Sequence, residues 1–229
     1  MRKIGLILLL VIFVSANTSA QLPKSKIQKT KISLPKIVKL EDEILKEINT
    51  LRENPQAYVK YLEEMRKSFR GTNFKNAAGV DVISIEGVKA VDEAITALKT
   101  QTPLPVLKMS EGLSKAANKH HQDMIQKDFF GHKGSDNSLP DDRAKLFGTA
   151  LSGVNENLME GSKSAREIVL QTLVDDGFAS RNHRKNLLSP QFKLIGISAG
   201  ETNKRSLCVL VFASSFVEGK GGAKQIKSF

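Results

Sequence analysis

The stretch RSLCVLVFASSF, residues 205–216, decides the fold class of this chain. From Leu207 to Ala213 its residues are apolar without alternation, which is typical of a central strand that is covered on both faces of a sheet. FKLIGISAG, residues 192–200, predicts a second strand just before it. The ordered part of the chain is therefore expected to end on two strands.

The segments before these strands have apolar residues at helical spacing. Ser164 and Glu167 resemble a capping box, in which each side chain bonds the exposed backbone N–H of the other, and they predict the start of one helix. Residues 131–162 are rich in Gly, Asp, Asn and Ser, and a long irregular segment of this kind is often functional. Helices followed by strands indicate an α+β or layered α/β/α domain. The other predicted helical segments are 40–51, 57–65, 88–98 and 113–125.

Residues 1–20, MRKIGLILLLVIFVSANTSA, have the pattern of a secretory signal peptide. Two early cations precede an apolar run, and small residues up to Ala20 mark the predicted cleavage site. An uncleaved membrane anchor is the alternative, but the run from Ile4 to Val14 is shorter than the roughly 20 residues that span a bilayer. We therefore expect a secreted protein, extracellular or periplasmic.

The rest of the chain is predicted to contain a basic linker, one domain and a tail. Residues 21–39 hold six Lys and no acid, which predicts an extended linker. Residues 40–217 are predicted to form the domain and residues 218–229 a flexible tail. A domain of this size can bury a core without disulfides. Since Cys208 is the only cysteine and lies in an apolar run, we expect it to be a buried thiol.

The formal net charge of +11 favours anionic partners, and removal of the two cations in residues 1–20 would leave +9. Lipid headgroups, acidic glycans and cell-wall polymers are the expected surfaces, and residues 21–39 would make the contact with a membrane surface. Nucleic acid is not expected as a partner, because the chain has no Trp and two Tyr for base stacking and carries an export pattern. A surface adhesin that binds only through Lys24 to Lys39 is a further hypothesis.

Several catalytic motifs are absent from the sequence, namely the HExxH helix of zinc proteases, the GxSxG elbow, the P-loop and the dinucleotide fingerprint. Polar residues in the irregular segments remain, and two imidazoles with one or two carboxylates would make a divalent-metal or acid–base site if they converge. Their spacing matches no local ligand motif, so a buried hydrogen-bond network that fixes the loops is the competing hypothesis. These residues are His132, Glu156, Asp175, Asp176 and His183.

Four parts of the chain, in this order, resemble the SCP/CAP superfamily of cysteine-rich secretory proteins, antigen 5 and plant pathogenesis-related proteins of class 1. The resemblance is closest to the bacterial-type branch without disulfides and covers residues 41–216. It implies a three-layer α-β-α sandwich with a cavity that is lined by two histidines and two acids. The stretches are LKEINTLRENPQAYVKYL, LPVLKMSEGLSKAANKHHQDMIQKDFFGH, SLPDDRAKLFG with VNENL, and SRNHRKNLLSPQFKLIGIS.

The resemblance assigns three of the four cavity positions to His132, Glu156 and His183. The second acid of the family follows a common Trp by three residues. Here Leu173 takes the place of that Trp, which gives Asp176 as the second acid and leaves Asp175 as the alternative.

The resemblance also implies roles for these side chains. His132 and His183 would bind a divalent cation such as Zn²⁺, and Glu156 and Asp176 would orient the two imidazoles.

The surroundings of these residues differ from the family pattern in several ways. Asn155 stands where the family commonly has Gly, and the aromatic segment near the second histidine is absent, as are the disulfides of animal and plant members. These departures argue against the animal and plant activities for this chain. Arg143 is expected to bond a nearby carboxylate, and His120 and His121 are expected to be packing or surface residues of their helix.

The sequence therefore predicts a secreted SCP/CAP-domain protein that acts as a binding module for a lipid, a sterol or an anionic cell-surface ligand. A metal-dependent hydrolase, either a protease or a cell-wall-directed enzyme, is the alternative. Binding is favoured because no residue stands out as a nucleophile, and no catalytic residue is assigned.

Overall fold

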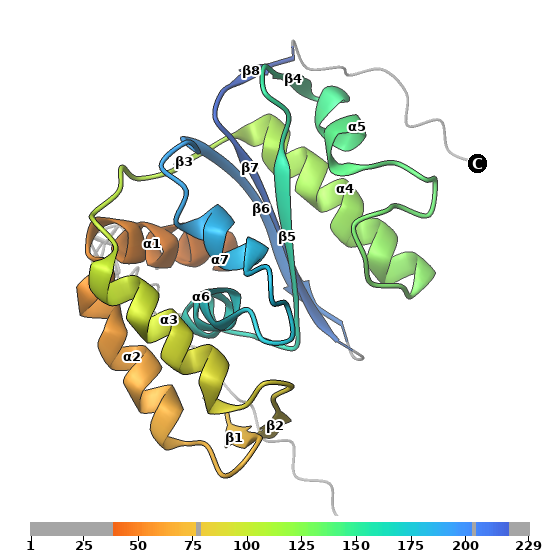
Figure 1. Ribbon diagram of the computed structural model, residues 1–229. Helices are drawn as coiled ribbons and strands as arrows, with labels where there is room; N and C mark the ends of the chain where they lie inside the picture. Colours follow the sequence, from red (N-terminus) through yellow and green to blue (C-terminus); the bar gives the residue numbers. More distant parts are fainter. Residues whose placement is uncertain (1–38, 77–78, 203–204, 220–229) are drawn as a thin grey trace, which may run out of the picture. The chain divides into compact units, whose positions relative to one another are not determined.

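The apolar stretch at residues 205–216 forms the centre of the sheet, as predicted. Strand β7 (Ser206–Ala213) is buried along its whole length and pairs antiparallel with both of its neighbours, β6 (Leu194–Glu201) and β5 (Asn155–Glu160). Strand β3 (Lys108–Met109) pairs in parallel with β6, and the strand order is β3–β6–β7–β5 (Figure 1). The two faces of β7 therefore belong to two different cores.

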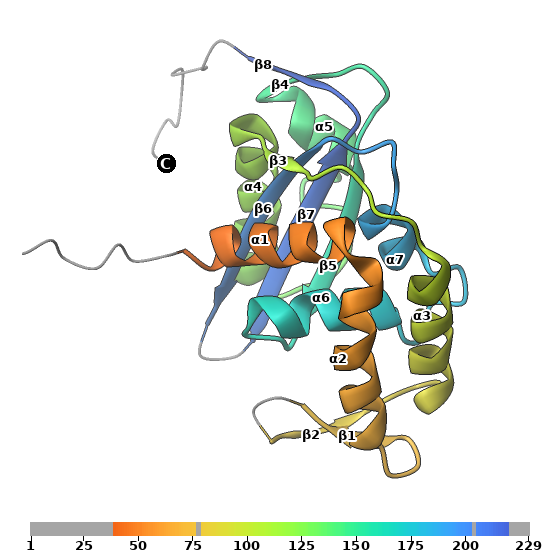
Figure 2. The ribbon, with the colours of Figure 1, turned by 90° about the vertical axis from the view of Figure 1, so that its left-hand side faces the viewer.

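Alternate residues of β7 supply those two cores. Cys208, Leu210 and Phe212 pack in the larger core with α1 (Leu40–Glu53) and α6 (Ala165–Val174). The residues between them pack in a smaller core against α4 (Glu111–Lys127) and α5 (Pro140–Lys145). The sheet thus lies between two helical layers (Figures 1 and 2), which confirms the α+β, three-layer α-β-α sandwich.

The layer that contains α1 and α6 has further helices outside it. Helices α2 (Pro55–Lys67) and α3 (Val88–Thr100) pack against each other, and α3 also contacts α6. A short helix, α7 (Asn182–Leu187), lies against α6 and β5 (Figure 1). The remaining strands form two small antiparallel pairs, β1 (Asn73–Lys75) with β2 (Asp81–Ile83) and β4 (Gly148–Ala150) with β8 (Phe216–Glu218).

Small residues on one face of β6 allow α4 to approach the sheet closely. Gly196, Ser198 and Gly200 alternate with larger residues along the strand and all lie under α4. A Cβ atom at Gly196 would overlap the backbone of Leu113 and Ser114, so the helix backbone itself rests on this strand. Since glycine has no Cβ, it is the residue that permits such an approach.

Three local predictions differ from the structure in detail. The stretch around Glu156 is strand β5 rather than part of an irregular loop. It is a strand because it pairs with β7, which is distant in the sequence, and a local sequence pattern does not reveal such pairing. The stretch around His183 is the helix α7 rather than a loop. The capping box at Ser164 is half formed: the Ser164 hydroxyl accepts from the Glu167 N–H at 3.3 Å, but the Glu167 carboxylate accepts from the N–H of Lys163 instead.

The structure is a computed structural model that describes residues 39–76, 79–202 and 205–219. The predicted signal peptide, residues 21–38 of the predicted linker and the tail from residue 220 lie outside the described residues. Strand β8 continues to Glu218, one residue beyond the boundary that the sequence predicts for the domain. Within the described ranges, no helix is both long and apolar enough to cross a membrane.

Cys208 has the environment that the sequence predicts. Its thiol is free and buried in the larger core, and burial raises the pKa of this thiol well above its ordinary value. A thiol of this kind packs as a small apolar side chain and is a poor nucleophile.

Candidate functional site

Strand β5 positions the centre of the site because successive side chains of a strand point to opposite faces. Glu156 points to the side of α4 and α5, where it contacts Arg143 and His132. Asn155 and Asn157 point to the other side, where both bond to α7. Three consecutive residues of one edge strand thus contact both helical layers.

The first histidine–acid pair forms on the α4 side of β5. His132 Nδ1 lies 2.9 Å from Glu156 Oε1, and the second carboxylate oxygen of Glu156 accepts from Arg143 at 2.8 Å. The Glu156 side chain is 1% exposed, whereas the His132 side chain is 51% exposed. An ionised carboxylate only accepts hydrogen bonds, so Nδ1 of His132 is the donor in this bond.

Arg143 fixes this half of the site, and its predicted bond to a carboxylate is present in the structure. Its guanidinium is buried and also donates to the backbone carbonyls of Ser138 and His132. These bonds hold both ends of the loop that carries His132 against Glu156. Removing one partner of a buried ion pair is costly, because the other charge is then left buried without a counter-ion.

His120 and His121 are buried in α4, as the packing alternative predicted. His120 Nε2 lies 2.8 Å from the carbonyl oxygen of Gly131 and 3.8 Å from Glu156, and His121 Nδ1 lies 2.9 Å from the Ser198 hydroxyl. Burial lowers the pKa of both histidines. His120 is therefore a neutral neighbour of Glu156 at neutral pH, a proximity that the sequence did not reveal.

The second pair forms on the other side of β5, between His183 and Asp175. His183 Nδ1 lies 2.6 Å from Asp175 Oδ1, and Asp175 Oδ2 accepts from the backbone N–H of His183 at 2.9 Å. The Asp175 side chain is fully buried. Asp175 therefore holds both the ring and the backbone at the start of α7.

The choice of Asp176 as the partner of His183 is corrected by this geometry. The Asp176 carboxylate accepts from the backbone N–H groups of Ile85 and Glu86, at 2.6 and 2.8 Å, and so fixes the segment before α3. Helix α6 ends at Val174, and Asp175 follows with a left-handed backbone, φ 53°. This reversal turns Asp175 towards α7. A residue count that assumes a regular helix does not predict such a turn, and it therefore gave Asp176.

Helix α7 is held in place by bonds to backbone carbonyls and amides. Arg184 donates to the carbonyls of Leu173, Val174 and Ala90. The Asn186 amide donates to Asn157 at 2.7 Å, and in turn accepts from Asn155 at 2.8 Å. The signal for this role was present in the sequence as the basic and amide residues around His183.

The side chains of Arg184 and Asn186 are therefore fixed in the structure. Leu187 is buried and Leu188 packs on the larger core.

The two imidazole rings face one another around the free edge of β5. Their centroids are 6.5 Å apart and the rings are tilted by 33°. Since each Nδ1 is bonded to a carboxylate, Nε2 is the nitrogen of each ring that would bind a metal. The arrangement brings together His132, Glu156, His183 and Asp175, whereas Asp176 lines the cavity beside His183 without bonding to either histidine.

The hydrogen bonds of these histidines fit a divalent metal, but the distance between the rings does not fit one directly. With Zn–N bonds of about 2.0–2.1 Å, two imidazoles on one tetrahedral Zn²⁺ have centroids about 5 Å apart. Within the part of the chain that the structure describes, no group of three or more His, Cys, Asp or Glu side chains is arranged to hold a metal ion. His132 and His183 would thus have to approach each other to share a cation.

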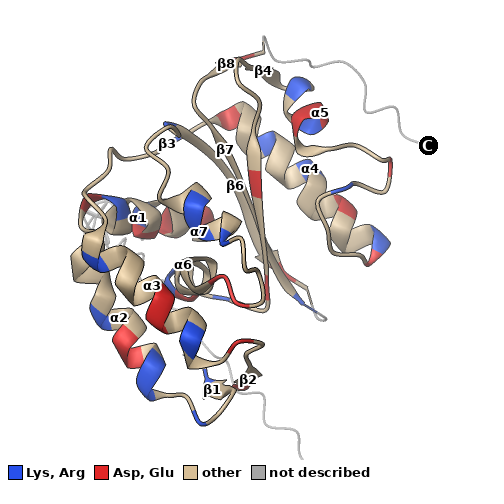
Figure 3. Ribbon diagram, viewed as in Figure 1, with Lys and Arg blue, Asp and Glu red and all other residues tan. Residues whose placement is uncertain are grey.

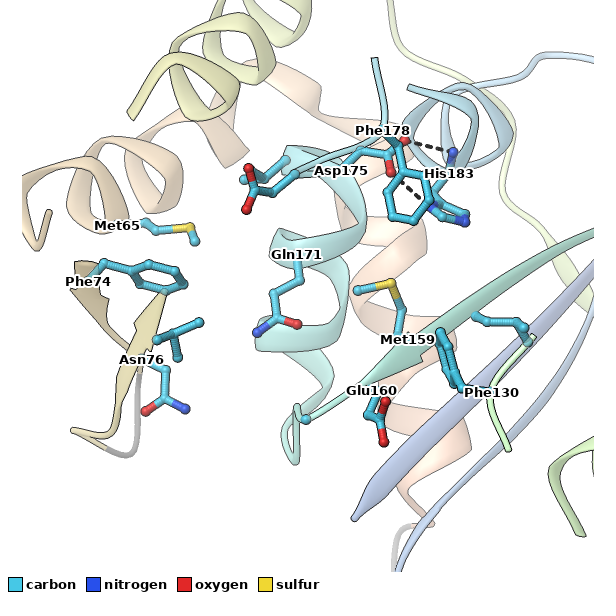
Figure 4. Close-up of a pocket in the computed structure, with 15 residues that line it drawn as sticks. Met65, Phe74, Asn76, Phe130, Met159, Glu160, Gln171, Asp175, Phe178 and His183 are labelled. Carbon is cyan, nitrogen blue, oxygen red and sulfur yellow. Dashed lines mark hydrogen bonds and ion pairs between the residues drawn. The ribbon is translucent and has the colours of Figure 1, made fainter. Parts of the chain in front are cut away.

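A cavity of about 340 Å³ lies beside His183 (Figure 4). Most of its wall is apolar, and Phe178 stands edge-on to the His183 ring with centroids 5.1 Å apart. Asp175, Asp176 and Glu160 also line it, and none of the described Lys or Arg residues belongs to its wall. The apolar side chains of the wall include Met65, Phe74, Val82, Phe130, Leu158, Met159, Val174 and Phe178.

A second cavity, of about 350 Å³, adjoins the first. The two share Met65, Phe74, Asn76 and Gln171, so they are neighbours between α2, the β1–β2 pair and α6. Lys and Arg residues of the described ranges are spread over helices on both sides of the sheet (Figure 3). The wall of the first cavity carries Glu160, Asp175 and Asp176, whereas Lys75 and Arg166 line the second.

Comparison with known proteins places this arrangement in a family. An uncharacterized protein of Bacillus subtilis (strain 168), YkwD, is 34% identical over 131 residues, which cover 57% of this chain and 48% of that protein. The chain thus spans about half the length of that relative.

Two solved structures are similar over part of the chain. An extracellular protein of Bacillus anthracis that contains an SCP domain is 21% identical, with a TM-score of 0.40, over 56% of this chain and 42% of its own. An outer surface protein of Borrelia burgdorferi is 16% identical, with a TM-score of 0.40, over 71% of this chain and 93% of its own. The model of the cysteine-rich secretory protein (CAP) family matches residues 45–212, which is most of the chain, and this chain therefore belongs to that family.

Proposed function

We propose that this protein is a secreted binding module that seats the apolar part of an extracellular ligand in the cavity beside His183. The cavity itself is the observation that carries the proposal. Its volume of about 340 Å³ lies in the range of small-molecule sites, which are mostly apolar with a few fixed polar groups. Here His183 and Asp175 supply such groups, and their mutual bonds fix them in position.

The proposed ligand is a lipid, a sterol or another cell-surface molecule with an apolar group. Met65 and Met159 support this choice, because methionine side chains adapt to the shape of an apolar ligand. Secretion is supported by the pattern of residues 1–20, and attraction to anionic surfaces by the six Lys of residues 21–39.

Replacement of Phe178 by Ala tests the cavity as a binding site. Phe178 lines the cavity and is 56% exposed, so its removal is expected to leave the fold intact. We expect a dansyl-labelled fatty acid or a fluorescent sterol to bind the wild type saturably and the Phe178→Ala variant about tenfold more weakly, since a lost aromatic contact is worth about 1 kcal/mol or slightly more. Fluorescence titration measures both affinities.

The matched control is Leu151→Ala, which removes an exposed apolar side chain outside the cavity. This variant should bind like the wild type. Equal affinities for all three proteins would contradict the proposed site, and binding to none of them would contradict a lipid or sterol as its ligand.

A metal-dependent hydrolase is the second candidate, and the two histidine–acid pairs favour it. Nε2 of His132 and of His183 would hold the ion, with Glu156 and Asp175 fixing the rings. A bound Zn²⁺ would supply Lewis-acid polarisation of a substrate carbonyl. The protein's own contribution would be the orientation of the two imidazoles and the apolar wall that excludes water.

Zinc titration separates this candidate from a purely structural role of the histidines. We expect His132→Ala and His183→Ala each to weaken Zn²⁺ binding strongly, and Asp175→Asn to weaken it by about 10- to 100-fold through loss of ring orientation. Calorimetry measures the affinities, and Phe130→Ala is a control that keeps all four groups. If the double variant without His132 and His183 binds Zn²⁺ as well as the wild type, the metal hypothesis fails.

A further inference from the structure

Strand β5 has one free edge. It lies at the end of the sheet order β3–β6–β7–β5, so β7 pairs with one side of it and none of the strands among the described residues pairs with the other. An unpaired edge exposes a row of backbone N–H and C=O groups that can bond to another chain.

The register of the sheet tells which residues of β5 present these groups. The N–H of Gly161 donates to the carbonyl of Ser206, which extends the ladder between β5 and β7 by one pair. In an antiparallel pair, directly bonded residues alternate with residues whose backbone groups point away. Asn155, Asn157 and Met159 therefore bond to β7.

The bonds on the other side of β7 agree with this register. The N–H of Thr202 donates to the carbonyl of Arg205, so the odd-numbered residues from Leu207 to Ala213 bond to β6 and the even-numbered residues bond to β5. It follows that the N–H and C=O groups of Glu156, Leu158 and Glu160 point outwards. Among the described residues, no group bonds to the outward N–H and C=O of Leu158 or Glu160.

The cavity beside His183 opens on this free part of the edge. Phe130, which follows α4, lies in the wall on one side of the sheet, and Gln171 of α6 lies in the wall on the other side. Leu158 and Glu160 belong to the same wall, and Figure 4 shows Glu160 between Phe130 and Gln171, so the cavity passes around the edge of β5. Nearer the start of β5, the edge is covered by α7, where Asn157 bonds to the carbonyl of His183.

We propose that this edge binds an extended peptide, which pairs with Leu158 to Glu160 and adds a fifth strand to the sheet. This inference rests on the proposed function, since it names the ligand class of the same cavity. A peptide backbone supplies donors and acceptors for the outward groups of Leu158 and Glu160, which a lipid tail cannot do. The side chains of the peptide would alternate between the Phe130 side and the Met159 side of the edge.

The charges of the cavity wall select the kind of peptide. Asp175 and Asp176 line it, and Glu160, which also lines it, is already paired with Arg205. No Lys or Arg of the described ranges belongs to this wall, so a neutral or cationic segment with apolar side chains is complementary. An acidic segment would place like charges together and is disfavoured.

Replacement of Glu160 by Pro tests the edge directly. Proline at this position removes the outward N–H but none of the bonds to β7, and proline is tolerated on edge strands where its nitrogen faces solvent. Glu160→Ala is the matched control, because it also loses the ion pair with Arg205 but keeps the N–H. We expect Glu160→Pro to bind peptide about tenfold more weakly than Glu160→Ala, the value of one lost hydrogen bond.

The probe is a pool of capped hexapeptides in which Lys alternates with Val, Ile, Leu or Phe. We expect at least one member to bind the wild type with a Kd below about 1 mM and to slow hydrogen exchange of the Leu158 and Glu160 amides. Methylation of the peptide backbone nitrogens that would face β5 keeps every side chain of the peptide. It removes the N–H donors to β5 and should abolish binding. This second comparison uses only wild-type protein, so it stays decisive if Glu160→Pro does not fold.

Each outcome decides between the hypotheses. If no peptide of the pool binds, or if the methylated peptides or Glu160→Pro bind equally well, the inference is wrong. If peptides fail while the fluorescent lipid or sterol binds, the proposed function stands without this ligand class. If neither binds, the proposed function itself fails.

Discussion

Replacement of Glu156 by Ala is expected to lower the free energy of unfolding by about 3–5 kcal/mol. The Glu156 and Arg143 side chains are both almost completely buried, and they bond directly at 2.8 Å. Removing the carboxylate leaves the guanidinium of Arg143 buried with two backbone carbonyls and no anion. It also removes the partner of His132 Nδ1, so the loop from His132 to Ser138 should become more mobile.

Urea unfolding at neutral pH, followed by circular dichroism, measures this loss. Glu156→Gln keeps the shape and one acceptor oxygen and should lose less stability than Glu156→Ala. The double variant Arg143→Met with Glu156→Leu removes both charges and should recover roughly half of the loss or more, since an apolar pair can replace a buried ion pair. A Glu156→Ala variant within about 0.5 kcal/mol of the wild type, the range of ordinary surface substitutions, would show that the pair is not buried as described.

Replacement of Gly196 by Ala is expected to destabilise the domain by about 3 kcal/mol or more, at the upper end for an overpacked core. The new methyl group would overlap the carbonyl group of Leu113 and the backbone nitrogen of Ser114. Backbone atoms cannot rotate away as a side chain can, so α4 would have to move off β6. Since α4 carries His120 and leads into His132, the site should be distorted as well.

Gly131→Ala is the matched control because a Cβ at Gly131 meets nothing within 4 Å. It should change the free energy of unfolding by less than about 1 kcal/mol. Urea unfolding gives both values, and hydrogen exchange of the α4 amides reports whether the helix has loosened. If Gly196→Ala unfolds at the same urea concentration as the wild type, the close approach of α4 to β6 is refuted.

The sequence predicted three of the four side chains of the candidate site. His132, Glu156 and His183 meet at the edge of β5 as the family resemblance implied. The fourth was assigned to Asp176, and the structure brings Asp175 to His183 instead. The error is one residue in a segment where the helix ends and the backbone turns left-handed, and residues on either side of such a turn point in very different directions.

Other parts of the site had no sequence signal that could be interpreted in isolation. The cavity beside His183 joins residues of α2, β1, β5 and α6, which are far apart in the chain. The free edge of β5 follows from the strand order and from the register with β7, neither of which leaves a mark in the stretch VNENLMEG itself.

The sequence by itself determined the buried faces of this protein. The apolar run of β7 and the helical spacing of α1, α3 and α4 specify which side chains avoid water, because burial of apolar surface depends on local periodicity. Only the tertiary structure decided which acid meets which histidine and where the sheet is left unpaired. Those features depend on strand register and on single backbone reversals, and a shift of one residue in either points a side chain to the other face.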